Sequence, residues 1–268
     1  MNRNPNGLVV LVKGGGEMAS GVVHRLASCH FRICMTEVPI PQAVRREVAF
    51  SEAVFDKEKE VEGIVAKRVD SPDQISRTWE EGKVPLLIDP EANVISFLKP
   101  DVIIDATLAK KNLGTKMTDA PLTIGLGPGF HAGRDVHLVI ETNRGHDLGR
   151  IISSGEAEPN TGIPGAISGY TEERVIRAPT DGIFRTLKKI GDDVKADEKI
   201  GIVGHASVQS RITGVIRGLL RDGATVWKGM KLGDVDPRGI KTNCYTISDK
   251  ARTISGGVLQ AILEYFNG

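Results

Sequence analysis

The chain has 268 residues, with 35 Lys or Arg against 34 Asp or Glu, which gives a formal net charge of +1. This balance argues against a protein held on nucleic acid by a basic surface, and the 2 Trp, 3 Tyr and 7 Phe offer few rings for base stacking. The 3 cysteines show no Cys-x-x-Cys spacing, and no apolar run approaches the roughly 18 residues of a membrane span. We therefore expect a cytoplasmic, globular protein of about two domains, without nucleic-acid or membrane partners.

The first half of the chain alternates apolar runs of strand length with helical patterns. Between these runs, Ser71 and Gln74 have the spacing of a capping box that starts a helix, and Gly82 is typical of a helix end. Strands that alternate with helices predict a mostly parallel, Rossmann-like α/β domain, which we place at residues 1–150. The expected strands cover residues 8–12, 31–37, 64–69, 84–89, 101–105, 122–126 and 136–141.

A glycine-rich turn follows the first expected strand. Gly14, Gly16 and Ala19 stand in the order Gly-x-Gly-x-x-Ala before a helical pattern. Glu37 ends the second strand about twenty residues later. In a dinucleotide-binding fold, such glycines let the backbone approach a pyrophosphate, and the acid bonds a ribose hydroxyl. We therefore expect these four residues to contact a cofactor; the alternative is a turn of this shape in a protein that binds no dinucleotide.

Two further loops are expected to face this turn from the same edge of the sheet. Thr107 follows the strand at 101–105, and Gly127 lies in a second glycine-rich turn at 125–129. Ligands of open α/β sheets bind beyond the carboxyl ends of the strands, and turn amides can hold an oxyanion. We therefore expect Thr107 and Gly127 to contact the cofactor as well. A tight turn selected for backbone freedom alone is the alternative at 125–129.

Polar and histidine-containing segments follow. Arg144 and His146 are the best candidates for catalytic groups, because a guanidinium binds anions and an imidazole transfers protons near neutral pH. A metal site that includes His131 or His137 is a less favoured alternative. No His-x-His or His-x-x-x-His spacing occurs, and we assign no metal. The turn-rich stretch at 151–174 is expected to be a linker.

The second half contains an internal repeat. Residues 181–184 (Asp-Gly-Ile-Phe) align with residues 213–216 (Thr-Gly-Val-Ile). Two such units resemble the barrel-sandwich hybrid of biotinyl and lipoyl domains, which we place at 175–240. Residues 203–210, where a carrier domain would hold its lysine, contain none, so we expect a structural or docking module. Within 241–268, a short strand near 244–250 and a helix at 258–266 are expected to pack back on a domain.

Longer motifs resemble one family over essentially the whole chain past Gly7. The matching segments are Arg45-Arg46 and residues 112–115, 125–130, 141–150, 158–165, 233–238 and 247–250. They are similar to the YqeB-type proteins of selenium-dependent molybdenum hydroxylase systems. The family opening Gly-Ala-Gly-Asp-Leu-Ala-Thr-Gly differs here, because Glu17 stands at the position of the Asp. Taken alone, Arg45 and Arg46 fit either a contact to an anionic ligand or a solvated helix face.

The resemblance implies an accessory role in the maturation or cofactor supply of such a hydroxylase. The implied ligand is a nucleotide, with a molybdopterin dinucleotide or NAD(P) as candidate cofactors. The implied partner is a molybdenum hydroxylase, and a homo-oligomer is a further possibility. The chain has no cysteine cluster for iron–sulfur centres, so it is not itself a whole hydroxylase. Two alternatives stay open, an NAD(P)-dependent oxidoreductase and a non-enzymatic docking scaffold.

Overall fold

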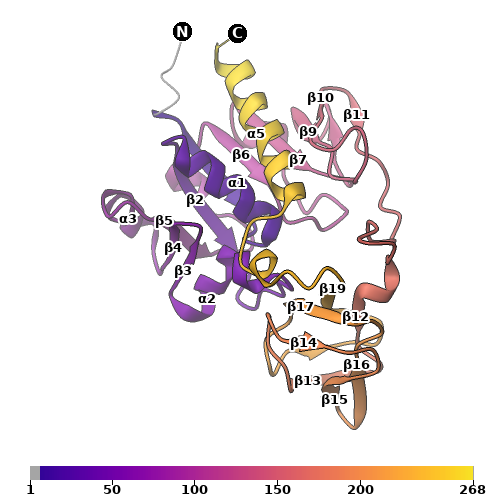
Figure 1. Cartoon of the computed structure of the whole chain (residues 1–268). Coiled ribbons are helices and arrows are strands. Elements are labelled where there is room, and N and C mark those ends of the chain that lie inside the picture. Colours follow the sequence, from indigo (N-terminus) through magenta and orange to yellow (C-terminus); the bar gives the residue numbers. More distant parts are fainter. Residues whose placement is uncertain (1–6, 268) are drawn as a thin grey trace. The chain divides into compact units, whose positions relative to one another are not determined.

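A nine-stranded sheet organises the first part of the chain (Figure 1). The structure is a computed structural model that describes residues 7–267. The strand order is β10-β9-β7-β6-β1-β2-β5-β4-β3. Neighbouring strands are parallel except for β3–β4 and β9–β10 at the two edges, which confirms the mostly parallel sheet predicted from the sequence. The bounds are β1 Val9–Lys13, β2 Arg32–Glu37, β3 Glu58–Val61, β4 Ile64–Val69, β5 Val84–Ile88, β6 Val102–Asp105, β7 Leu122–Leu126, β9 Leu138–Ile140 and β10 Ile151–Ile152.

The central strands are apolar because both of their faces are covered. Leu11 of β1 lies in register with Cys34 of β2 and Ile103 of β6, and all three side chains are fully buried. They pack in one cluster with Ile75 and Val94. The helices of this part are α1 Glu17–Ser28, α2 Ala53–Asp56, α3 Ile75–Glu80, α4 Ile95–Leu98 and α5 Asp249–Asn267.

Helices α1 and α5 lie side by side, as Figure 1 shows. A Cβ atom on Gly21 would come within 2.8 Å of the Cβ of Ala251, so only glycine allows this approach. One turn further along both helices, Arg25 donates a hydrogen bond of 2.8 Å to Ser255. The two helices therefore run parallel, and their N-termini lie at the same end. Among the helices of residues 7–267, none is long and apolar enough to cross a bilayer.

Three local predictions need correction. Helix α5 begins at Asp249 and not at 258, and a 3-10 turn at Lys241–Cys244 stands before it in place of the expected strand. Gly257, one of the two glycines that suggested a later start, is a packing residue, since a Cβ there would clash with the carbonyl of Gly149. In the expected capping box, Gln74 accepts a hydrogen bond from the amide of Asp70 and not from that of Ser71. The remaining 3-10 turns are Arg46–Val48, Phe50–Glu52, Pro72–Gln74, Met117–Asp119 and Glu172–Arg174.

The chain divides into two units that are interleaved in sequence. The first unit runs through Pro41, includes Ala49–Asn160 and resumes at Ile247. The second unit consists of Gln42–Val48 and Thr161–Thr246. The stretch expected as a linker at 151–174 starts with strand β10 and with β11 (Gly155–Glu156), which pairs with β8 (His131–Ala132). Its first ten residues therefore belong to the first unit.

The second unit contains two four-stranded antiparallel sheets with the orders β12-β19-β17-β14 and β16-β15-β13-β18. The sequence repeat is visible in this topology. Strand β13 lies between β15 and β18, as β17 lies between β19 and β14. Phe184 and Leu219 are fully buried in the shared core. The bounds are β12 Val175–Arg177, β13 Gly182–Thr186, β14 Asp193–Val194, β15 Lys199–Val203, β16 Ala206–Gln209, β17 Gly214–Leu219, β18 Thr225–Val226 and β19 Lys231–Asp236.

Candidate functional site

The first candidate site lies at the carboxyl ends of β1 and β6. Strand β1 is flanked by β2 on one side and by β6 on the other, so the direction in which successive strands are added to the sheet reverses at β1. In open α/β sheets, ligands bind beside such a switch point, at the loops that follow the two strands. Lys13 ends β1 and lies in register with Asp105, which ends β6.

Lys13 and Asp105 form a buried polar network at the ends of these two strands. The Nζ of Lys13 lies 3.4 Å from a carboxylate oxygen of Asp105 and donates a hydrogen bond of 2.7 Å to the hydroxyl of Thr115. The hydroxyls of Thr115 and Thr107 donate to Asp105 at 2.6 and 2.7 Å. Because Asp105 is fully buried and its oxygens accept these bonds, the network fixes the loops and is not a free catalytic base.

The glycines of the first turn serve two different purposes. Gly14 has a φ of +94°, and a Cβ there would meet the carbonyl oxygen of Ala106 at 3.2 Å. A Cβ on Gly15 would meet the amide of Ser51 at 2.8 Å. These two positions are therefore filled by the protein's own backbone. Gly16, at the N-cap of α1, has nothing within 4 Å of its Cβ position and leaves open space.

Glu37 lies beside this turn, as the sequence predicts, but its carboxylate bonds to main chain. One oxygen accepts from the amide of Gly15 at 2.8 Å and the other from the amide of Val38 at 2.7 Å. Burial raises the pKa of Glu37, and the two backbone hydrogen bonds oppose that shift. Ala19 is fully buried within α1 and presents no atom to a ligand. Glu37 therefore holds the shape of the turn.

The second glycine turn is also closed by packing. Gly127 has a φ of +75°, and a Cβ there would clash with the hydroxyl of Thr142. Its amide donates to the carbonyl of Ile140 at 2.9 Å. The turn thus joins the loop after β7 to the loop after β9, which agrees with the interpretation that glycine provides backbone freedom here.

The loop after β9 is organised by a buried carboxylate. Glu141 is 3% exposed and accepts hydrogen bonds from the amides of Thr142 and Asn143, both at 2.7 Å. Its other oxygen accepts from the amide of Glu158 at 2.8 Å. Three main-chain donors therefore satisfy Glu141, and the loop that carries Arg144 is fixed from below.

Arg144 and His146 differ in their surroundings. Arg144 makes two hydrogen bonds, of 2.7 and 2.8 Å, to the carboxylate of Asp249 in the first turn of α5. His146 is exposed, and the part of the chain that the structure describes provides it with no hydrogen bond or ion pair. The two predicted catalytic residues are close in sequence, but they share no contact partner. Of this pair, only Arg144 is tied to the α5 end of the site.

The histidines considered as metal ligands each have separate roles. His137 accepts a hydrogen bond of 3.0 Å from the amide of Thr123, and burial lowers its pKa. A ring nitrogen of His131 lies 2.9 Å from the carbonyl of Ala132. Within residues 7–267, no group of three or more His, Cys, Asp and Glu is arranged to hold a metal ion.

Lys250 is a residue of the site that was given no role from sequence. It follows Asp249 in the first turn of α5 and is partly buried. Burial lowers its pKa and the charge of Arg144 lowers it further, whereas Glu17, Glu141 and Asp249 act in the opposite direction. Its only sequence signal was membership in the segment 247–250, because the groups around it come from three separate places in the chain: α1, the loop after β9 and the start of α5.

The parallel N-termini of α1 and α5 add positive partial charge at this end of the first unit. Helix α1 has no side-chain cap at Gly16, so its first amides have no side-chain partner from the N-cap. The hydroxyl of Ser248 caps α5 by accepting from the amide of Ala251 at 3.3 Å. With Arg144 and Lys250 nearby, the arrangement is suited to an anionic group of a ligand.

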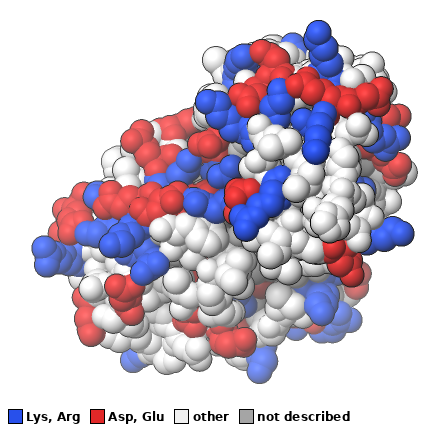
Figure 2. All heavy atoms as spheres, turned by 90° about the horizontal axis from the view of Figure 1, so that it is seen from below, with Lys and Arg blue, Asp and Glu red and all other residues white. Residues whose placement is uncertain are grey.

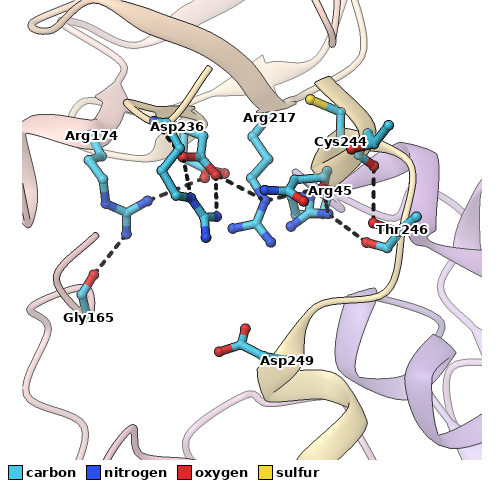
Figure 3. Close-up of polar contacts among 12 residues, drawn as sticks. Arg45, Gly165, Arg174, Arg217, Asp236, Cys244, Thr246 and Asp249 are labelled. Atoms are coloured by element: carbon cyan, nitrogen blue, oxygen red, sulfur yellow. Dashed lines mark hydrogen bonds and ion pairs between the residues drawn. The ribbon is translucent and has the colours of Figure 1, made fainter. Parts of the chain in front are cut away.

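The second unit contains a separate cluster of buried arginines. Figure 3 shows Asp236 between Arg174 and Arg217, with Arg45 beyond Arg217. These arginines are 7–8% exposed, and Asp236 is fully buried. Burial would raise the pKa of Asp236, but hydrogen bonds and charge from Arg238, together with the charge of Arg217, hold it below its ordinary value.

The arginines of this cluster fasten main-chain segments. Arg45 donates to the carbonyls of Asn243 and Thr246 at 2.9 and 3.3 Å, and Arg174 donates to that of Gly165 at 3.0 Å (Figure 3). The sequence leaves open a contact of Arg45 with an anionic ligand, and these hydrogen bonds give it a structural role within the second unit. The cluster therefore ties residues 42–48 and the ends of the segment 161–246 to its sheets.

The cysteines are poor nucleophiles in these surroundings. Burial raises the pKa of Cys34 to about 12, and the charge of Asp89 acts in the same direction. Burial also raises the pKa of Cys244, although the charges of Arg45 and Arg217 oppose this shift. Since the thiolate is the reactive form, neither of these two buried cysteines is activated.

Comparison with known proteins gives one close relative in sequence. The chain is 49% identical over 255 residues to the uncharacterized protein YqeB of Escherichia coli (strain K12), a match that covers 95% of this chain and 47% of YqeB. No protein-family model matches.

Similarity to solved structures is weak. The ectoine utilization protein EutE (DoeB) from Ruegeria pomeroyi overlaps at 12% identity and a TM-score of 0.26, with 85% of each chain covered. A succinylglutamatedesuccinylase/aspartoacylase from Rhodobacter sphaeroides overlaps at 14% identity and a TM-score of 0.26, again with 85% of each chain covered. Scores at this level carry no functional information. The informative similarity is to YqeB, and the chain spans about half the length of that relative.

Proposed function

We propose that this chain binds a nucleotide-type ligand at the carboxyl edge of its parallel sheet and serves the maturation of a selenium-dependent molybdenum hydroxylase. The observation that carries the binding proposal is the open space at Gly16, where the N-termini of α1 and α5 meet beside Lys250. The hydroxylase role rests on the resemblance of the longer motifs. The chain spans about half the length of its relative, YqeB.

The phosphate of the ligand would lie at the N-terminus of α1. The uncapped amides after Gly16 and the partial charge of two parallel helices favour an anion at that place. Arg144 adds a full positive charge, although the carboxylate of Asp249 accepts both hydrogen bonds that Arg144 donates in that pair. The Lys250 amine adds a hydrogen-bond donor. On the face drawn in Figure 2, basic and acidic side chains are interspersed. The formal net charge of the chain is only +1, so attraction would depend on local groups near the site.

A dinucleotide such as molybdopterin dinucleotide or NAD(P) fits the glycine motif best. Glu37 is engaged with the amides of Gly15 and Val38, so its remaining acceptor capacity would have to serve a ribose. Thr107 is an exposed residue on the facing loop, and its hydroxyl donates a hydrogen bond to Asp105. Hydride transfer with bound NAD(P) would instead support an oxidoreductase.

The second unit would act as a docking module of the barrel-sandwich hybrid type. Two antiparallel sheets related by the internal repeat support this assignment. The turn between β15 and β16 contains Gly204 and His205 and no lysine, so a lipoyl- or biotin-type arm cannot be attached there. The proposed partner of this unit is the hydroxylase, and a second copy of the chain is the alternative.

Calorimetric titration with NADH, NADPH, CTP, ATP and molybdopterin dinucleotide tests the binding proposal. Gly16→Val adds bulk at the open position while the backbone, at a φ of −68°, accepts valine without strain. We expect one of these ligands to bind the wild type and to lose its affinity for Gly16→Val. Gly256→Val is the matched control, because Gly256 lies in α5 with nothing within 4 Å of its Cβ position. If folded Gly16→Val binds the ligand with the same affinity as the wild type, the ligand does not bind at Gly16.

A further inference from the structure

We propose that the Lys250 amine is a nucleophile that forms an imine with a carbonyl compound carrying an anionic group. This inference rests on the proposed anion site for the orientation of the compound. It differs from that proposal in its chemistry, because an imine requires a free amine at one atom, whereas anion binding requires only positive charge.

The surrounding acids are already engaged by other donors. Asp249, the sequence neighbour of Lys250, accepts two hydrogen bonds from Arg144. Glu141 accepts three from main-chain amides. Throughout residues 7–267, no carboxylate lies within ion-pair distance of the Lys250 ammonium, and no hydrogen bond holds it. A lysine that is partly buried and lacks a bonded counterion is an exception in this chain.

Other lysines provide the contrast. Lys13 is buried, but it is paired with Asp105 and bonded to Thr115. Lys188 is paired with Glu198, and this pairing raises its pKa. The Lys188 amine is therefore less available as a lone pair, since the bonded carboxylate stabilises its ammonium form.

The electrostatic surroundings of Lys250 favour the neutral amine. Burial is the largest cause of its lowered pKa, and the charge of Arg144 is the second. Glu17 from α1, Glu141 from the loop after β9 and Asp249 from α5 oppose the shift without cancelling it. Its position in the first turn of a 19-residue helix also disfavours a cation. The lowered pKa increases the share of free amine at neutral pH, and a lowered pKa is how nucleophilic lysines are usually activated.

The backbone of Lys250 is held firmly while its side chain stays accessible. Ala251 packs against Gly21, and Arg252 makes hydrogen bonds of 2.8 and 2.7 Å to both carboxylate oxygens of Glu62. Lys250 itself is only partly buried. The main chain of Lys250 is therefore fixed while its side chain keeps some exposure, which favours a repeatable attack geometry.

Imine formation at Lys250 requires no oxidant or reductant. The amine nitrogen attacks the carbonyl carbon, a C–N bond forms, and a proton moves from nitrogen to oxygen to give a carbinolamine. Loss of that hydroxyl as water breaks the C–O bond and leaves the imine, which water can hydrolyse back. The anionic group of the compound would be oriented by Arg144 and by the amides at the N-terminus of α1.

Pyridoxal 5′-phosphate and pyridoxal form a matched pair of probes for this inference, because they share the aldehyde and differ in the phosphate. The full chain is incubated briefly with each probe near pH 7, reduced with borohydride and mapped by peptide mass spectrometry. We expect Lys250 to be labelled severalfold faster than Lys188 in the same sample, and faster by the phosphate-bearing probe. Lys250→Arg keeps the positive charge and should lose the adduct at that position.

The outcomes separate the two proposals. Labelling of Lys250 at equal rates by both probes would support the reactive amine and contradict the anion site. Labelling of Lys250 no faster than Lys188 by either probe would overturn the nucleophile, whether or not nucleotides bind in calorimetry. Circular dichroism of Lys250→Arg confirms that a lost adduct does not reflect unfolding.

Discussion

Arg144 and Asp249 join two segments that are far apart in sequence through two parallel hydrogen bonds of 2.7 and 2.8 Å. The pair ties the loop after β9 to the first turn of α5. It places a guanidinium beside Lys250, whose pKa it lowers, and it occupies the carboxylate nearest to Lys250 in sequence. One exposed ion pair thus sets the charge pattern at the N-terminus of α5.

Arg144→Gln is expected to change the site more than the stability. The side chains of Arg144 and Asp249 are 38% and 70% exposed, so loss of the pair should cost about 1 kcal/mol or less of unfolding free energy. Without the charge of Arg144, the pKa of Lys250 should rise, and the pH at which Lys250 reacts with pyridoxal 5′-phosphate should move upward. His146→Ala, at an exposed residue on the same loop, should leave that pH profile unchanged. An unchanged profile in Arg144→Gln would contradict the assigned role of Arg144.

Lys13→Met is expected to destabilise the first unit strongly. It would leave the fully buried carboxylate of Asp105 without its cation, and breaking a buried ion pair typically costs about 3–5 kcal/mol. Urea unfolding measures the loss. A double-mutant cycle with Asp105→Asn should show strong coupling, and additive effects of the two changes would show that the pair contributes little.

Gly15 and Gly16 are adjacent, but alanine should affect them differently. In Gly15→Ala the new methyl would meet the backbone of Ser51 at 2.8 Å, and overpacking of this kind costs about 1–3 kcal/mol. In Gly16→Ala the methyl faces open space. The loss of stability should therefore be limited to the preference of the N-cap position for glycine over alanine. Thermal unfolding of the two variants makes the comparison. Equal losses would mean that the turn is not packed in this way.

Lys250→Met should stabilise the protein slightly at neutral pH. A lysine whose folded pKa lies below its ordinary value of 10.5 is charged more easily in the unfolded chain, so it opposes folding at pH values below its folded pKa. This opposition fades as the pH rises from the folded pKa to 10.5, where the amine is neutral in both states. The gain of Lys250→Met over the wild type in urea should therefore shrink over that range.

Lys188→Met is expected to change the folding stability in the opposite direction. Pairing with Glu198 raises the pKa of Lys188, so its contribution stabilises the folded state below 10.5 and is lost as the pH rises through the folded pKa. Lys188→Met should lose some stability at neutral pH. A stabilised Lys188→Met, or a destabilised Lys250→Met, would contradict the two charge environments described above.

Seven of the nine strands in the large sheet could be predicted from sequence because a covered parallel sheet needs continuous apolar runs, such as that of β1. The antiparallel edge strands β3 and β10 were not predicted. The repeat in the second unit was visible for a similar reason, since each copy must fill the same core around Phe184 or Ile216. The start of α5 was misplaced because Gly257 suggests a break, and only its contact with Gly149 explains it.

The site was only partly predictable. Gly16 and Glu37 follow from a local motif, and the structure brings Glu37 to the first turn. The roles of Lys13 and Lys250 depend on partners far along the chain, such as Asp105 for the first and Arg144 for the second. Spacing within one segment does not reveal such pairs. For the same reason, the sequence does not reveal the packing of Ser51 against Gly15.

Native mass spectrometry of the freshly purified chain, before and after addition of NAD(H), NADP(H), CTP, ATP and molybdopterin dinucleotide, tests the central proposal most directly. We predict a bound mass of one dinucleotide per chain, either copurified or acquired, that is absent from Gly16→Val. A folded wild-type chain that acquires none of these masses would contradict nucleotide binding at the N-terminus of α1.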